Sequence, residues 1–104
     1  MIRGMLLMLL MLLLAAGGEA QDSALVARGQ GVFKDQPCYG CHTVGKTGTP
    51  IATDLSRIGA KHDEAYLVRW LRDPSEQRPT AHMPKLRLTE SEVQALAAYL
   101  GSLR

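Results

Sequence analysis

Both cysteines of this 104-residue chain lie in one pentapeptide, Cys38-Tyr39-Gly40-Cys41-His42, and this limits the possible folds more than any other feature. A chain this short buries only a modest share of its surface, so a stable fold needs a staple in addition to its apolar core. Two thiols three positions apart can only crosslink or bind a group at one place in the chain. They can form a disulfide or hold a larger group, and the fold must be arranged around that point.

The pentapeptide has the C-x-x-C-H arrangement, which suits covalent attachment of haem. Each thiol can add to one vinyl group of the same porphyrin. The histidine that follows is then held beneath the iron, which needs a proximal nitrogen ligand. The sequence therefore predicts one haem c attached through Cys38 and Cys41, with His42 as a ligand of the iron.

Three other uses of the cysteines have less support. A structural zinc site needs four ligands, and the histidines of the chain, His42, His62 and His82, form no H-x₃₋₅-H pair. A thioredoxin-like redox pair is expected in a β-α-β setting, which this sequence lacks. A disulfide that closes so short a loop would stabilise the chain little.

Residues 1–20 have the order of a secretory signal: a basic residue, an uncharged apolar run over residues 5–16, and small residues at Gly18 and Ala20. An uncleaved membrane anchor is the alternative, but a spanning helix needs about 20 apolar residues and this run is shorter. We expect a cleavable signal peptide, followed by a single exported, periplasmic domain over residues 21–104 that has no stable membrane span.

Two segments have clear helical periodicity in the first three quarters of the chain, and nothing alternates with period two for long enough to predict a strand. The first runs over about residues 22–34 and carries Gly29 on its apolar face. The second runs over about residues 62–72. It ends before Asp73-Pro74, because the residue that precedes a proline avoids helical geometry.

A third helix has the clearest start, because Thr89 and Glu92 form the T-x-x-E capping box. Its apolar stripe consists of Val93, Leu96, Ala97, Leu100 and Leu103. The sequence therefore predicts an all-α fold with long loops at about residues 35–61 and 73–88. Loops of that length in so small a domain need something between them that organises them.

Met83 is the only methionine of residues 21–104, because four of the five methionines lie in the predicted signal. It lies in a polar, proline-flanked segment, Pro79 to Pro84, where a core methionine is not expected. A thioether opposite histidine raises the reduction potential of haem and suits electron transfer. Met83 is therefore the predicted second axial ligand, and His82 and His62 are the alternatives.

Residues 22–103 resemble the class I cytochromes c, which are small monohaem electron carriers. The resemblance includes CYGCH at 38–42, the segment WLRDPSEQRPTAHMP that ends at Pro84, and LAAYL at 96–100. It implies a cytochrome c fold, in which three main helices and their loops wrap around one covalently bound haem. It also implies that the first and last helices cross at right angles, with contacts among Gly29, Phe33, Leu96 and Tyr99.

The resemblance implies further residues of the haem site. In the family, a proline in the loop after the haem motif accepts a hydrogen bond from the proximal histidine, which orients that ligand and sets its basicity. We favour Pro50 for this role, and Thr53 is the alternative. Trp70 is expected on the distal side of the haem, near the methionine sulfur, and Leu71 is expected to pack on the ring.

A protein of this kind carries single electrons and needs no catalytic residues, because both axial ligands stay bound. We expect redox protein partners, an electron donor and an acceptor. The formal net charge of +2 indicates no nucleic-acid partner. The basic residues that could steer an acidic partner are Lys46, Arg78, Lys85 and Arg87. Two alternatives stay open: a haem subunit of a larger oxidoreductase, and a gas-binding or peroxidatic haem protein with a displaceable Met83.

Overall fold

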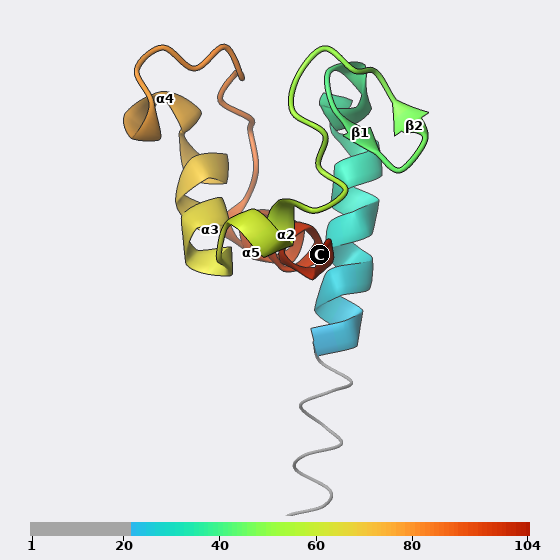
Figure 1. The fold of residues 1–104 in the computed structure, drawn as a ribbon. Coiled ribbons are helices and arrows are strands. Elements are labelled where there is room, and N and C mark those ends of the chain that lie inside the picture. Colours follow the sequence, from blue (N-terminus) through green and yellow to red (C-terminus); the bar gives the residue numbers. More distant parts are fainter. Residues whose placement is uncertain (1–21) are drawn as a thin grey trace, which may run out of the picture.

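The computed structural model describes residues 22–104 (Figure 1), and the predicted signal peptide, residues 1–20, lies outside them. The described residues are mostly helical, as predicted. Their one departure from an all-α fold is an antiparallel hairpin of two-residue strands, β1 (Thr43–Val44) and β2 (Thr47–Gly48). Gly45 in the hairpin turn has a φ of 59°, which glycine adopts without strain.

The cysteine motif is folded as one tight turn. The helix of residues 22–35 ends one residue before the 3-10 helix η1 (Pro37–Gly40), whose first residue is a proline. Proline fits there because its missing N–H and fixed φ suit the first turn of a helix. The backbone amides of Cys41 and His42 both donate to the carbonyl of Cys38, at 3.2 and 2.9 Å. These bonds fix the two cysteines relative to each other.

The C-terminal half of the described chain forms the helices α2 (Ile58–Lys61), α3 (Glu64–Arg72), α4 (Pro74–Gln77) and α5 (Glu90–Ser102). The second predicted helix is confirmed as α3. Asp63 caps it by accepting a hydrogen bond from the amide of Tyr66 at 2.8 Å, and it ends before the proline as expected. The predicted loops at 35–61 and 73–88 also hold the single turns η1, α2 and α4, which are too short to show helical periodicity.

The third predicted helix is α5, and its capping box is confirmed. Thr89 Oγ1 accepts from the amide of Glu92 at 3.2 Å, and Glu92 Oε1 accepts from the amide of Thr89 at 3.0 Å. The buried residues of α5 are Val93, Ala95, Leu96, Ala97, Ala98, Tyr99 and Leu100. The helix is therefore covered over a wider arc than its apolar stripe alone predicts.

The N-terminal helix and α5 approach each other closely at Gly29. A Cβ at this position would overlap the carbonyl group of Ala95 and lie 2.7 Å from the Cβ of Tyr99. Beside this contact, the rings of Phe33 and Tyr99 are 5.6 Å apart, and Phe33 and Leu96 are 1% and 0% exposed. The contacts of Gly29 and Phe33 with Tyr99 that the resemblance implies are confirmed, and the close approach at Gly29 explains a glycine that is otherwise costly inside a helix.

α5 also sets the spacing of the two sides of the fold. In Figure 1 the N-terminal helix and the hairpin stand on one side, α3 and α4 stand on the other, and α5 lies with α2 between their lower parts. The amide of Gly59 in α2 donates to the carbonyl of Leu103 at 2.7 Å, which joins α2 to the end of α5. α2 is therefore fixed to the C-terminal end of this central helix.

We expect Gly29→Ala to lower the free energy of unfolding by about 1–3 kcal/mol, the usual cost of forcing an extra carbon into a packed contact. Gly31 is the matched control, because it lies in the same helix and a Cβ there would meet nothing within 4 Å. Gly31→Ala should raise the free energy of unfolding by up to about 1 kcal/mol. Chemical denaturation of both variants measures the difference, and effects of equal sign would contradict this account of the crossing.

The capping box should make stability depend on pH. The pKa of Glu92 is lowered, chiefly because the backbone amide of Thr89 donates to its carboxylate. Such a carboxylate stabilises the fold above its unfolded pKa of about 4.3, and this contribution is lost as the pH falls through the folded value. The stability difference between the wild type and Glu92→Gln should therefore be largest at neutral pH and shrink in acid. Denaturation at a series of pH values tests this, and a constant difference would count against it.

Candidate functional site

A large apolar cavity lies between the two sides of the fold. Its volume is about 960 Å³, at the upper end of the range of about 300–1,000 Å³ that ligand pockets span. Its apolar lining includes Phe33, Leu55, Ile58, Leu67, Leu71, Leu96 and Leu100. These residues all belong to the buried core as well, so the cavity reaches into the centre of the molecule.

Both cysteines line this cavity. Cys38 lies in η1 and Cys41 follows it as the C-cap, and both side chains reach the same cavity. Cys38 is half-buried, Cys41 is exposed, and the two are not joined by a disulfide. Burial raises the pKa of the Cys38 thiol, although a hydrogen bond to its own backbone acts in the opposite direction.

His42 also lines the cavity, and its ring is held by the backbone. The Nδ1 atom lies 2.6 Å from the carbonyl oxygen of Thr53. Because a carbonyl oxygen can only accept, Nδ1 is the donor and carries the proton. The other ring nitrogen, Nε2, is then the one left with a lone pair for a metal ion.

The prediction that Pro50 supplies this carbonyl is wrong, and the alternative, Thr53, is the acceptor. The reason lies in the turn that follows the proline. The amides of Ile51 and Ala52 both donate to the carbonyl of Cys41, at 3.2 and 2.7 Å. This turn brings residue 53 to the histidine ring, and Pro50 is not among the residues that line the cavity.

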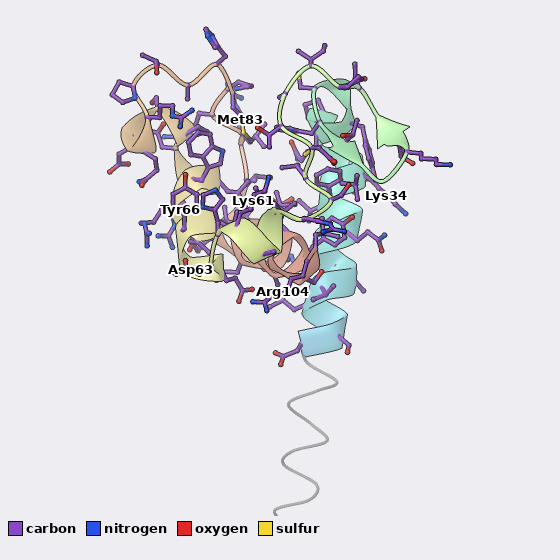
Figure 2. The ribbon with its side chains drawn as sticks, in the orientation of Figure 1. Lys34, Lys61, Asp63, Tyr66, Met83 and Arg104 are labelled. Carbon is purple, nitrogen blue, oxygen red and sulfur yellow. The ribbon has the colours of Figure 1, made fainter. Side chains whose placement is uncertain are left out.

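Met83 reaches the cavity from the opposite side of the fold. It lies in the loop between α4 and α5, packs against the core, and is directed toward the cysteine side in Figure 2. The indole Nε1–H of Trp70, on α3, donates to the Met83 sulfur at 3.2 Å. Trp70 therefore lies beside the methionine sulfur as expected, and Leu71, which is 4% exposed, lines the same cavity.

The two alternative ligands, His62 and His82, line the cavity as well. His82 is exposed, whereas the ring of His62 stacks on Tyr66 with a centroid distance of 4.2 Å. Over residues 22–104, no group of three or more histidine, cysteine or acidic side chains is arranged to hold a metal ion. The zinc alternative therefore gains no support from the geometry.

Comparison with known proteins identifies the family. The family model of cytochrome c matches residues 26–104. The chain belongs to the cytochrome c family. The predicted cytochrome c fold is thereby confirmed, and the cofactor of this cytochrome c is covalently bound haem c. Cys38 and Cys41 are the only cysteines of the chain and have the spacing that this attachment needs.

This cytochrome c is also similar to parts of two longer curated proteins. Both are named cytochrome c oxidase subunit 2. The protein from Alkalihalophilus pseudofirmus is 32% identical in an alignment 95 residues long that covers 83% of this chain and 28% of that protein. The protein from Bacillus sp. (strain PS3) is 34% identical in an alignment 91 residues long that covers 73% of this chain and 25% of that protein. The chain therefore spans about a quarter of the length of these relatives.

The residues present in the cavity suit a covalently attached haem. Its walls are mainly apolar, as the hydrocarbon surface of a porphyrin requires. One wall carries the two thiols and an imidazole whose Nδ1 is already occupied, and the other carries a thioether, Met83. Imidazole nitrogen and thioether sulfur are both established ligands of haem iron.

Some lining residues were missed in the sequence. Tyr66 lies between His62 and Trp70, with ring centroids 4.2 and 6.4 Å from theirs. A signal was available, because positions four apart share one face of a helix. Lys61 also lines the cavity, and no local pattern marks it, since the single turn of α2 brings it there. Arg78, named in the sequence only as a residue that could steer a partner, lines the cavity as well.

Proposed function

We propose that this cytochrome c is an exported monohaem protein that carries single electrons between a donor and an acceptor protein. In this proposal Cys38 and Cys41 attach the haem, and His42 and Met83 are its two axial ligands. The observation that carries the proposal is a single apolar cavity that both thiols, the oriented imidazole and the thioether all line. The bound haem supplies the chemistry, which is the uptake and release of one electron at its iron.

The protein side chains hold this centre unchanged while the electron moves. His42 donates its Nδ1 proton to the Thr53 carbonyl, which leaves Nε2 for the iron and raises the basicity of the ring. Trp70 fixes the sulfur of Met83 by donating to it. Leu71 and the other apolar lining residues exclude water. If His42 and Met83 both hold the iron, the chain would leave no ligand position for a substrate, so we assign no catalytic residues.

Two basic side chains at the cavity fit an acidic partner surface. Lys61 and Arg78 line the cavity itself. Lys46, Lys85 and Arg87 are exposed. Positive charge near the cofactor would steer and orient an acidic donor or acceptor during brief encounters. The net charge of +2 is too small to favour a nucleic-acid partner.

Export is the part of the proposal that rests on the sequence of residues 1–20. We assign that segment to a cleaved signal and residues 21–104 to a periplasmic cytochrome c domain. None of the helices formed by residues 22–104 has the length and apolar character to cross a membrane. Electron transfer outside the cytoplasmic membrane is compatible with covalent haem attachment through two thiols.

The relatives favour a second candidate, a haem subunit bound to a larger oxidoreductase. Their name, cytochrome c oxidase subunit 2, describes proteins in which a segment similar to this chain is part of an oxidase subunit. The chemistry at the iron is the same in both cases. Purification of the native protein under mild conditions distinguishes them, because a subunit co-purifies in fixed stoichiometry with its complex and a free carrier does not.

Absorbance spectra of the purified protein test the haem site. We expect one haem per chain and a low-spin ferric spectrum with a weak far-red sulfur-to-iron band. Met83→Ala should abolish that band, whereas His82→Ala, one residue away, should leave it intact. A high-spin ferric haem that binds cyanide or carbon monoxide at once would instead support the gas-binding or peroxidatic alternative.

Covalent haem retained after denaturation by a Cys38→Ala, Cys41→Ala double variant would refute the attachment.

The hydrogen bond from Trp70 should protect the Met83 ligand from displacement. Trp70→Phe keeps an aromatic ring but removes the N–H group that donates to the sulfur. Loss of one such hydrogen bond, about 1 kcal/mol, should raise the affinity of the ferric protein for cyanide about fivefold. Tyr66→Phe is the control, because it keeps the neighbouring stacked ring, and its cyanide affinity should stay close to that of the wild type. Equal affinities for all three proteins would exclude this role of Trp70.

A further inference from the structure

We propose that Asp54 is a positioning residue that holds the Thr53 carbonyl against the ring of His42. This inference rests on the proposed function, because it concerns the proximal ligand of the haem. Proline would fix its own φ angle at this position, but threonine does not. Thr53 is exposed and lies in a loop, so its carbonyl needs another restraint to stay 2.6 Å from Nδ1.

The carboxylate of Asp54 supplies such a restraint. Its Oδ1 atom accepts three hydrogen bonds: from Ser56 Oγ at 2.7 Å, from the Ser56 amide at 3.1 Å and from Thr43 Oγ1 at 3.1 Å. Thr43 directly follows His42, and Asp54 directly follows Thr53. The Oδ1 atom of Asp54 therefore links the residue after Thr53 to the residue after His42, next to the contact between the Thr53 carbonyl and the His42 ring.

Two more hydrogen bonds extend this connection between the same two segments. The amide of Gly45 donates to Ser56 Oγ at 2.7 Å, and the amide of Leu55 donates to the carbonyl of Thr43 at 2.8 Å. Leu55 is 8% exposed, which anchors the loop in the core. We call the group Thr43, Gly45, Asp54 and Ser56 the Asp54 clamp.

The charge state of Asp54 suits this role. The pKa of its carboxyl is lowered, chiefly by the hydrogen bond from the Ser56 hydroxyl, so the group is an ionised acceptor at neutral pH. Hydrogen bonds to a charged acceptor are stronger than those between neutral groups. Because the clamp is exposed to water, its net contribution to global stability is small. Its effect should therefore appear in the orientation of the His42 ring rather than in the free energy of unfolding.

The test follows the Nδ1 proton of His42 in the intact holoprotein. In the reduced, diamagnetic protein labelled with ¹⁵N-histidine, the exchange of this proton with solvent requires that the contact with the Thr53 carbonyl opens. Asp54→Ala should speed the exchange about tenfold, and Ser56→Ala should speed it in the same direction. Asp54→Asn should speed the exchange less than Asp54→Ala, because the amide oxygen still accepts hydrogen bonds, although it has two lone pairs and no charge.

Asp73→Ala is the matched control. Asp73 Oδ1 accepts from the amide and the hydroxyl of Ser75, at 3.2 and 2.7 Å, which is the same local arrangement at the start of α4. This variant should leave the exchange of the His42 proton unchanged. The reduction potential provides a second readout, because a weaker Nδ1–H bond lowers the basicity of the ligand and should raise the potential in Asp54→Ala more than in Asp54→Asn.

Two outcomes would overturn the proposed role of the Asp54 clamp. One is an exchange rate in Asp54→Ala within about twofold of the wild-type rate. The other is an equal acceleration in Asp54→Ala and Asp54→Asn, which would indicate that the charge of Asp54, and not its hydrogen bonds, controls the exchange. Both are distinct from a failure of the proposed function. If the wild-type protein carries no covalent haem, or if His42 is not its ligand, the wild-type spectrum shows this before any variant is compared.

Discussion

The packing of two helices against α5 is the contact on which the rest of this structure depends. At Gly29 the backbone of the N-terminal helix approaches Ala95 so closely that a single methyl group would not fit. Gly59 makes a similar approach at Gly101, near the other end of α5. Side chains at these points would push the elements apart. Two glycines therefore allow the N-terminal helix and α2 to lie this close to α5, and neither of them lines the cavity.

The two walls of the cavity are held by different means. The wall with Met83 follows a helix, since Trp70 extends from the rigid α3 and donates to the sulfur. The wall with His42 is a loop, and it depends on hydrogen bonds between residues eleven positions apart, from Thr43 to Asp54 and from Gly45 to Ser56. The Trp70 side of the cavity can be anticipated from helical periodicity. The His42 side depends on tertiary contacts that no local sequence pattern predicts.

This difference explains how far the sequence could predict the molecule. The box of Thr89 with Glu92 depends on residues three positions apart, so it was predicted and is confirmed. Pro50 was the wrong acceptor, because the identity of the carbonyl beneath His42 depends on how the chain turns after the proline. α4 was missed although a capping aspartate and a first-turn proline mark its start, since a helix of one turn has no periodicity.

The cavity and the core share their side chains, and this couples haem binding to folding. Phe33, Leu96 and Leu100 belong both to the buried cluster and to the cavity wall. A wall of this kind gains its full dispersion contacts only when a group of matching shape lies against it. A ligand that binds the folded chain and not the unfolded one stabilises the fold, and covalent attachment keeps that ligand beside the chain. The pentapeptide at 38–42 therefore supplies the staple that so short a chain needs.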